Sequence, residues 1–598
     1  METVHPIMVQ RISRAFALAT LLIILSSPEV SVASSALHPQ RSCKCLPSEP
    51  CWPSTESWAI LNSTVSDQPI ATHPAAYACH EPHYDSAACQ KIQEGYYLNW
   101  WRQAQPGAVQ QTNWEVSGDN GCLGLNRTAP CHQGALPLYT VNATTIEHVQ
   151  ETVNFAAKHN IRLVIKNTGH DYLGRSTGAS SLGLWVFNNK DITFNDKFVP
   201  DGADENTESK GVVILGPGVT WNDVYKAADV HGVIVVGGAE PTVGASGGYC
   251  QGGGHSPLSR LYGLCVDNVV QYKVVTADGI IKVVNAFQDK ELFWALRGGG
   301  GGTFAVVVEA VYLTHPPLKR IQVAIYQVYF QGRDTRHKLI NNWFSRQVNL
   351  AADGWSGYSY IQDDSLKVAF FLPDKDQVFA SNSISPFFDY AESLGGVLVV
   401  GLINTFSSFW SAFEASKSAL EDNKAGMNGV LGSRLIPRRN MEFPDRMEEL
   451  ADALLKAQDA IRGYWNPNAF FLTQLVAGGA VANGSRTETS VHPAWREALM
   501  NVIFLSRWED DLPVKEQQAI ARQLTSTIQI LRDITPGSGA YFNEADPGEP
   551  DWQTNYFGSN YSLLKSLKDL VDPKGLFLCN KCVGSEDWSD DFSCPRLK

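Results

Sequence analysis

Hydrophobic positions between residues 136 and 316 alternate between helical and strand spacing. Ile146, Val149 and Val153 lie on one face of a helix that the capping-box pattern Thr144-x-x-Glu147 would begin. A second helix is expected to start at the pattern Thr220-x-x-Asp223, and a third to cover residues 291–296. Apolar, β-rich runs predict strands at residues 161–165, 211–215, 233–236, 269–276, 280–284 and 305–313. Asp278-Gly279 predicts a tight hairpin between two of these strands, and the region is therefore expected to be an α+β domain.

The pattern changes after residue 317. Strand-like runs at residues 321–330, 358–361, 367–372, 469–476 and 502–508 are mixed with helical spacing at 445–455 and 515–531. We expect residues 317–532 to form a second α+β domain, an antiparallel sheet capped by helices, that holds a substrate.

Two loops of the first domain carry the most specific chemistry. Residues 166–176 read KNTGHDYLGRS, and residues 241–255 read PTVGASGGYCQGGGH. Each follows an apolar strand-like run, so its glycines can present bare backbone N–H groups where the phosphates of a dinucleotide approach. Taken alone, the first loop could be a turn that happens to contain a histidine, and the second could be a structural bulge. The two loops together indicate a flavin site.

Other nucleotide sites fit the sequence less well. Gly298–Gly302 follows a predicted helix and enters a predicted strand, which is the reverse of the order in a Rossmann unit. No Gly-Lys-Ser/Thr motif for a P-loop is present. The net charge of −13 argues against a nucleic-acid partner, because the short basic stretch at residues 434–439 is too small for a polyanion.

The ends of the chain indicate secretion. Residues 1–33 have the layout of a cleaved signal peptide, with two arginines, a short apolar stretch and small residues before Ala33. No later segment has enough consecutive apolar residues to span a bilayer. All 12 cysteines follow residue 33, so disulfides are expected, with seven cysteines in a Cys-rich extension at residues 34–135. Cys579-x-x-Cys582 could be half of a zinc site, but no second pair with histidines lies at the right spacing, and no metal is expected.

The two loops and their spacing resemble the FAD-linked oxidases that include vanillyl-alcohol oxidase and, more closely, the berberine-bridge-enzyme-like oxidases. The match is strongest to secreted fungal members such as the isoamyl alcohol oxidases, and it extends from about Trp52 to Trp588. The resemblance implies a PCMH-type FAD-binding domain at residues 136–316. It also implies that residues 533–598, which include the segments 539–546 and 555–561, return to that domain.

The resemblance also implies which residues hold the cofactor. His170 would be bound covalently to the 8α-methyl group of FAD, with a cradle formed by Asn167, Thr168, Gly169, Asp171, Val243, Gly244, Gly247 and Gly248. Further cofactor contacts carried over with less support are Gly216, Gly218, Asp267, Asn268 and Val308. Many relatives make a second bond through a cysteine before Pro-Thr-Val-Gly, where this chain has Glu240, so a single covalent bond and no cysteinyl link are expected. Tyr249 stands where many relatives have a histidine, and Val243 matches a position associated with oxygen access.

The predicted reaction is hydride transfer from a small-molecule alcohol or similar C–H group to the flavin, with O2 reduced to H2O2. A base must then accept the hydroxyl proton. Tyr541, with Asn543 beside it, is the candidate, and Tyr556, Asn560 and Tyr561 are the alternatives. An oxidative cyclase, a carbohydrate oxidase and a non-catalytic flavin-binding protein remain open, as do the substrate and the oligomeric state.

Overall fold

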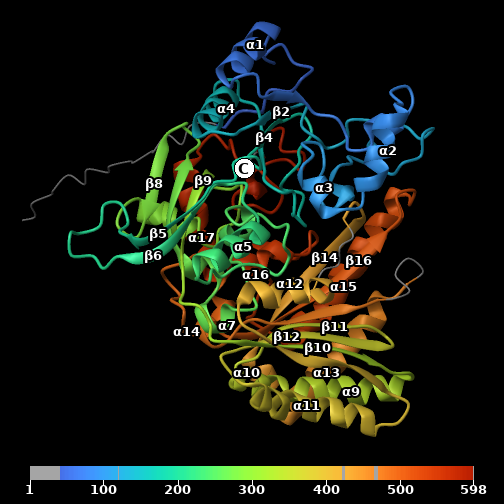
Figure 1. The fold of residues 1–598 in the computed structure, drawn as a ribbon. Coiled ribbons are helices and arrows are strands. Elements are labelled where there is room, and N and C mark those ends of the chain that lie inside the picture. The colour runs from blue at the N-terminus through green and yellow to red at the C-terminus, as the bar shows by residue number, and fades with distance from the viewer. Residues whose placement is uncertain (1–40, 119, 421–424, 464–468, 597–598) are drawn as a thin grey trace, which may run out of the picture. The chain divides into compact units, whose positions relative to one another are not determined.

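Three sheets carry the fold (Figure 1). The structure is a computed structural model that describes residues 41–118, 120–420, 425–463 and 469–596, and from Arg41 onward the chain forms one unit. The predicted signal peptide at residues 1–33 lies outside the described residues.

A four-stranded sheet lies near the amino-terminal end of the fold, in the order β1-β2-β4-β3. Its strands are β1 (Pro69–Ala71), β2 (Tyr139–Asn142), β3 (Leu163–Lys166) and β4 (Leu182–Trp185), of which β4 is parallel to both β2 and β3. Helix α4 (Ile146–Lys158) connects β2 to β3 and buries Val149 and Val153, as predicted. Its cap is Thr145, which accepts from the His148 N–H, so the prediction of a cap at Thr144 was wrong by one residue.

A five-stranded antiparallel sheet completes the first domain, in the order β5-β6-β9-β7-β8. Its strands are β5 (Ile192–Phe198), β6 (Lys210–Leu215), β7 (Val269–Val275), β8 (Ile281–Asn285) and β9 (Val306–Leu313). The β7–β8 hairpin and the capping box of α5 (Trp221–His231) are confirmed. The predicted strand at 233–236 is wrong, because only Ile234 pairs, in one bridge to His315, while Val235 and Val236 are buried without a ladder.

The second domain is built on a seven-stranded antiparallel sheet, in the order β13-β10-β12-β11-β15-β16-β14. Its strands are β10 (Ile321–Tyr329), β11 (Ser356–Ile361), β12 (Ser365–Pro373), β13 (Leu398–Phe406), β14 (Asn428–Pro437), β15 (Phe471–Leu475) and β16 (Ala498–Trp508). One face is covered by α9 (Arg333–Ser345), α11 (Gln377–Ser393), α13 (Pro444–Ile461) and α15 (Val514–Ile534), which bury an apolar cluster against it (Figure 1). The expected antiparallel sheet with helical caps is present, although strands β13 and β14 were not predicted.

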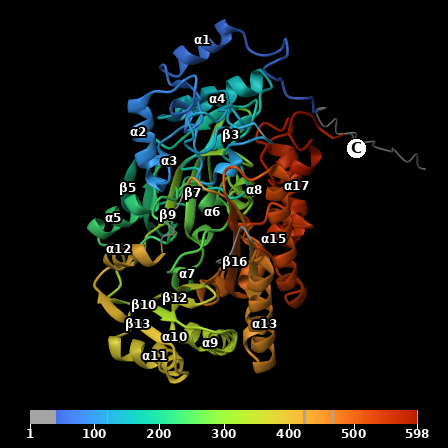
Figure 2. The same cartoon turned by 90° about the vertical axis from the view of Figure 1, so that its right-hand side faces the viewer.

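The remaining helices lie in the connections. They are α1 (Thr55–Thr64), α2 (Ser86–Gly95), α3 (Asn99–Gln103), α6 (Gly248–Gln251), α7 (Ser259–Tyr262), α8 (Lys290–Ala295), α10 (Gln347–Asp353), α12 (Phe409–Leu420), α14 (Ala480–Asn483), α16 (Trp552–Phe557) and α17 (Tyr561–Val571). Near the carboxyl end, α17 packs beside α8 (Figure 2), Phe577 pairs with Leu163 at the edge of β3, and Cys594 is bonded to Cys43. The carboxyl-terminal segment thus returns to the first domain.

All 12 cysteines are paired. The disulfides are Cys43–Cys594, Cys45–Cys51, Cys79–Cys89, Cys122–Cys131, Cys250–Cys265 and Cys579–Cys582. The expectation of disulfides is confirmed, and Cys579 and Cys582 bond to each other.

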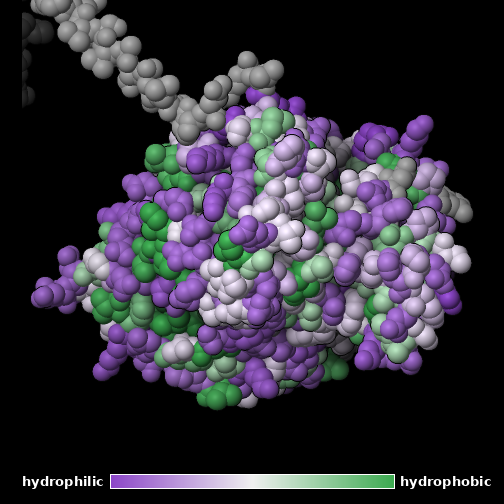
Figure 3. All heavy atoms as spheres, turned by 90° about the horizontal axis from the view of Figure 1, so that it is seen from above, coloured by the Kyte–Doolittle hydropathy of each residue, from purple (hydrophilic) through white to green (hydrophobic). Residues whose placement is uncertain are grey.

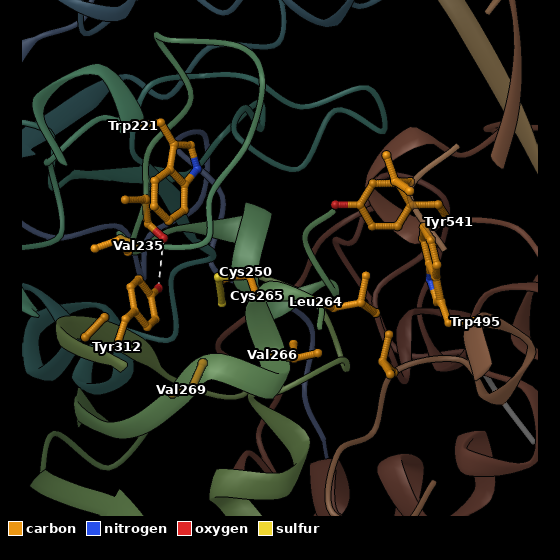
Figure 4. Packing of buried hydrophobic residues seen from close by; sticks show 14 of the residues in the cluster. Trp221, Val235, Cys250, Leu264, Cys265, Val266, Val269, Tyr312, Trp495 and Tyr541 are labelled. Carbon is orange, nitrogen blue, oxygen red and sulfur yellow. Dashed lines mark hydrogen bonds between the residues drawn. A yellow bond between two sulfur atoms is a disulfide. The ribbon is translucent and has the colours of Figure 1, made fainter. Parts of the chain in front are cut away.

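The largest apolar cluster connects the Gly-rich loop to the carboxyl-terminal segment. Figure 4 shows Trp221 and Tyr312 on one side, the Cys250–Cys265 disulfide in the middle, and Tyr541 on the other side. Tyr312 donates a 2.8 Å hydrogen bond from its hydroxyl to the Ala245 carbonyl, which fixes the start of the loop. The face seen in Figure 3 is largely hydrophilic, with hydrophobic residues in small groups. Among the described residues, no helix has the length and apolar character needed to cross a bilayer.

Candidate functional site

Two cavities meet at His170. The loop cavity is lined by the segments 167–176 and 243–251 and by residues 301–307. The sheet cavity, of about 260 Å³, is lined mainly by β11, β15 and β16, by the segments 238–243 and 425–431, and by the returning segment near Tyr541. His170, Arg175, Val243, Gly248 and Tyr249 line both, so the two cavities adjoin at these residues.

The two loops predicted to cradle a cofactor form the loop cavity. Its lining includes nine predicted residues: Asn167, Thr168, Gly169, His170, Asp171, Val243, Gly244, Gly247 and Gly248. The loops lie in direct contact, since a Cβ atom on Gly244 would lie 2.6 Å from the Asn167 side-chain nitrogen. Asn167 also donates to the Pro217 carbonyl, which brings the turn after β6 to the same cavity.

The lining of the loop cavity fits a large polar ligand. A Cβ atom on Gly248 would find no protein atom closer than 4.0 Å, so packing within the protein does not require glycine there. Three buried polar atoms of the lining have no hydrogen-bond partner among the described residues: Asn167 Oδ1, Arg175 Nη1 and Gln251 Oε1. Buried polar groups are normally satisfied by hydrogen bonds. Two free acceptors, one free donor and an open glycine in the same lining therefore suit a dinucleotide ligand.

Five of the predicted cofactor contacts do not line either cavity. Gly216 and Gly218 flank Pro217, which does, but both pack against residues 187–189 instead. Asp267 pairs with Arg496 at 2.6 Å, and Asn268 braces Leu264 and His315. Val308 is buried in an apolar cluster with α4. The structure gives these five residues supporting positions around the site.

His170 lies in a hydrogen-bonded chain that the sequence did not indicate. Its Nε2 atom is 2.6 Å from the Thr242 hydroxyl, and that hydroxyl donates to Glu240 Oε1 at 2.6 Å. Glu240 Oε1 also accepts from the Thr242 backbone N–H at 3.2 Å and from the Asn99 amide at 3.3 Å. Burial lowers the pKa of His170 to about 3, so its imidazole is neutral at physiological pH.

Tyr541 and Asn543 both line the sheet cavity. The Tyr541 oxygen accepts hydrogen bonds from Asn543 Nδ2 at 2.8 Å and from the Gly254 N–H at 3.2 Å. Burial and the nearby Glu544 raise the pKa of Tyr541, while its bonds to Asn543 and Gly254 act in the opposite direction. The 3₁₀ turn Phe542–Glu544 holds these side chains together.

A second pair of polar groups in this cavity was not predicted. His255 Nε2 lies 3.2 Å from Glu544 Oε1, and Asn501 donates to Glu544 Oε2 at 2.9 Å. The Tyr358 hydroxyl lies 3.4 Å from His255 Nδ1. His255 ends the Gly-rich loop and Glu544 follows Asn543 by one residue, so both lay inside segments that the sequence had singled out.

The alternative bases have other roles among the described residues. Tyr556 donates to the Asp546 carbonyl, Asn560 donates to the carbonyls of Ser490 and Val491, and Tyr561 donates to Glu586. None of the three lines the sheet cavity.

The Cys-rich extension contributes to the site, which sequence reasoning missed. Asn99 in α3, Gln110 and Gln111 line the sheet cavity, and Gln110 donates to the Thr168 carbonyl at 3.2 Å. The second domain adds apolar lining through Met427, Leu431, Phe470, Leu472, Ile503 and Leu505. No local motif marks these residues, because they reach the cavity only through the packing of separate segments.

Comparisons with known proteins identify the family of this chain. A family model described as FAD binding domain matches residues 137–285, and one described as berberine and berberine like matches residues 540–584. An uncharacterised FAD-linked oxidoreductase of Arthroderma benhamiae is 37% identical over 573 residues, which cover 92% of this chain and 95% of that protein. The chain belongs to the berberine-bridge-enzyme-like, FAD-linked oxidoreductases of the vanillyl-alcohol oxidase superfamily.

Solved structures show the same fold for this oxidoreductase. The VAO-type flavoprotein MtVAO615 from Myceliophthora thermophila C1 matches with a TM-score of 0.84 and 31% identity, over 93% of this chain and all of that one. The glucooligosaccharide oxidase of Acremonium strictum, described with a 6-S-cysteinyl, 8α-N1-histidyl FAD, has a TM-score of 0.62. Its sequence is 19% identical, over 78% of this chain and 94% of that one. At this identity, the comparison supports a shared fold and nothing further. The predicted family, its α+β fold and its FAD cofactor are confirmed.

Proposed function

We propose that this oxidoreductase oxidises a small-molecule alcohol or similar activated C–H group, by hydride transfer to an FAD bound covalently through His170, with O2 reduced to H2O2. The observation that carries the proposal is the position of His170, where the loop cavity adjoins the sheet cavity that Tyr541 lines. A ring attached there would face both.

FAD, when bound, supplies a two-electron acceptor whose reactive ring takes a hydride from the substrate. The loop residues Asn167–Asp171 and Val243–Gly248 would hold it, and Arg175 Nη1 and Gln251 Oε1 would find polar partners on it. Glu240 stands at the position where many relatives form a thioether. The next cysteines along the chain, Cys250 and Cys265, are bonded to each other, and none of the described cysteines is free, which supports a single covalent attachment.

Tyr541 is the proposed base for the substrate hydroxyl. Its oxygen already accepts two hydrogen bonds, and these would stabilise the phenolate that must form before it can accept a proton. The His255–Glu544 pair is the second candidate, because it lies in the same cavity and a carboxylate orients one imidazole nitrogen. His255→Asn and Tyr541→Phe variants separate the two, since only loss of the true base should reduce the rate of flavin reduction by 10²-fold or more.

The lining of the sheet cavity suits a substrate with an apolar body and a few polar groups. Leu431, Leu472 and Ile503 provide apolar contacts, while Gln110, Gln474 and Asn543 can hydrogen-bond a substrate hydroxyl. A carbohydrate oxidase is the alternative, since solved structures with this fold include one from Microdochium nivale.

The test is a peroxide-release screen of alcohols, phenols and sugars with the purified holoprotein. Flavin fluorescence that stays with the denatured chain, and is lost in His170→Ala, would support the covalent link. Bleaching of the flavin by substrate under anaerobic conditions would support catalysis, and a substrate that binds without bleaching would indicate a non-catalytic flavoprotein.

We also propose that the protein is secreted and glycosylated. Six disulfides suit an oxidising compartment. Asn126-Arg127-Thr128 and Asn483-Gly484-Ser485 match the acceptor pattern for N-glycosylation, and both asparagines are exposed. Recovery of the protein from culture medium, with a mass that falls on treatment with an endoglycosidase, would support both points.

A further inference from the structure

The contacts of Thr242 fix the direction of the hydrogen bonds around His170. Glu240 Oε1 faces the Thr242 backbone N–H and the Asn99 amide, both of which can only donate. This oxygen is therefore an acceptor, and the Thr242 hydroxyl donates its single proton to it. Toward His170, the Thr242 oxygen can then only accept.

The tautomer of His170 follows from this direction. Since Thr242 accepts, His170 Nε2 carries the ring proton, and the low pKa of the buried ring keeps the imidazole neutral. Nδ1 then holds the free lone pair. It is the only ring nitrogen able to act as a nucleophile in this arrangement.

We propose that Glu240 and Thr242 form a proton acceptor that prepares His170 Nδ1 for covalent attachment to FAD. The inference rests on the proposed covalent link at His170 and assigns a role to the carboxylate that replaces the relatives' cysteine. Glu240 and Thr242 are positioning residues, because they act on the cofactor only through His170.

Covalent attachment of FAD would form one bond and break two. His170 Nδ1 forms a bond to the 8α carbon of FAD, and one C–H bond of that methyl group breaks. The ring proton of Nε2 moves to the Thr242 oxygen as the Thr242 proton moves to Glu240, which leaves the attached imidazole neutral. The two electrons of the broken C–H bond reduce the flavin ring. O2 then accepts these electrons, together with the methyl proton and the proton from Nε2, to give H2O2.

The geometry favours a proton relay, from His170 Nε2 through the Thr242 hydroxyl to Glu240, over a role of these residues in packing alone. Glu240 and Thr242 belong to the same turn, which places the Thr242 hydroxyl at 2.6 Å from both the carboxylate and the imidazole. Thr242 is buried, and Asn99 closes the carboxylate from the side of α3. Two short bonds in series through a buried hydroxyl suit proton transfer better than an isolated surface carboxylate would.

The experiment follows covalent FAD by the mass of the denatured chain, during incubation of each purified protein with excess FAD. Thr242→Val removes the hydroxyl with little change in volume, Thr242→Ser restores it, and Glu240→Gln keeps an acceptor but removes the base. We expect Thr242→Val and Glu240→Gln to slow attachment at least tenfold. Thr242→Ser should stay within threefold of the wild type. FAD released by acid from the two slow variants would show that non-covalent binding persists.

Two results would overturn the inference. Attachment at the wild-type rate in both Thr242→Val and Glu240→Gln would exclude the relay, with His170→Ala as the control that abolishes attachment. Equal slowing in Thr242→Val and Thr242→Ser would indicate a packing role instead. If the wild type carries no covalent FAD, the proposed link at His170 fails as well, and that outcome differs from failure of the relay alone.

Discussion

Arg175 and Asn543 connect the His170 loop to the returning carboxyl-terminal segment. Arg175 Nη2 donates a 3.2 Å hydrogen bond to Asn543 Oδ1, and Asn543 Nδ2 in turn donates to the Tyr541 oxygen. Arg175 is itself held by Asp171 at 2.7 Å and lies over the Phe542 ring. The loop expected to bind the cofactor therefore also positions the proposed base, across 368 residues of sequence.

The first prediction concerns the Tyr541 hydroxyl. Tyr541→Phe removes the proposed base, and we expect the rate of anaerobic flavin reduction to fall by about 10²- to 10⁴-fold. Tyr556→Phe is the matched control, because it also deletes a buried hydroxyl but lies outside the cavity. Stopped-flow measurement of flavin reduction would check both. Similar rates in the wild type and Tyr541→Phe would remove Tyr541 as the base.

The pH dependence of the same rate gives a second prediction. Burial raises the pKa of Tyr541, and only the deprotonated form accepts a proton. In the pre-steady state, flavin reduction should therefore accelerate as the pH rises through the alkaline range, beyond the point where an ordinary tyrosine would have ionised. A rate that is flat above pH 7 would contradict this.

The part of the site that the sequence predicted consists of local loops. The glycines of residues 243–248 and His170 could be assigned to the site from the sequence, because their conformation and chemistry depend on neighbours in the same loop. Asn99, Gln110 and Tyr358 could not be predicted in this way, since each reaches the cavity only when separate segments pack together. Strand β14 was missed for a related reason. All ten of its residues are buried, so it shows no alternation of polar and apolar positions.

The incorrect prediction of a strand at residues 233–236 also has its cause in tertiary packing. Strand propensity is high at Val233, Val235 and Val236. Only Ile234 forms a β-bridge, and the chain then continues without regular structure toward Glu240. Packing against the core around Trp221 decides its conformation, which is an example of tertiary context overriding propensity.

A third prediction concerns Gly248, the glycine that protein packing does not require. In a His170→Ala background, where only non-covalent contacts retain FAD, Gly248→Ala should lower the flavin-to-protein ratio at least fivefold. Its thermal unfolding without FAD should be unchanged, because the added Cβ meets no protein atom closer than 4.0 Å. Gly244→Ala is the contrasting control, since its Cβ would lie 2.6 Å from Asn167 and should destabilise the protein itself. Full flavin retention in the Gly248 variant would argue against a cofactor in front of this residue.

The Cys250–Cys265 disulfide leads to a fourth prediction. Replacing both cysteines by serine should reduce the free energy of local opening by about 3 kcal/mol, the chain-entropy value for a loop of this length. Amide hydrogen exchange between residues 250 and 265 would report the change directly. The Cys579–Cys582 disulfide joins cysteines only 3 residues apart in sequence. Replacing both by serine should lower the free energy of local opening by about 2 kcal/mol there and leave amide exchange at residues 250–265 unaltered. Unchanged exchange at 250–265 would show that packing around Leu264, and not the disulfide, holds this segment.

A fifth prediction follows from His492, which is buried beneath the carboxyl-terminal segment. Burial lowers the pKa of His492 to about 4, and its Nδ1 accepts from the Ala494 N–H while Nε2 lies 3.0 Å from the Thr554 carbonyl. The unfolded chain protonates this histidine near pH 6.5, so between pH 6.5 and 4 the unfolded state binds the extra proton. Stability from this group is therefore complete above pH 6.5 and falls by roughly 3 kcal/mol as the pH drops to 4. His492→Asn keeps an acceptor for the Ala494 N–H but cannot titrate, so its stability difference from the wild type should shrink over that window. Denaturation curves at several pH values would test this, and a difference independent of pH would rule it out.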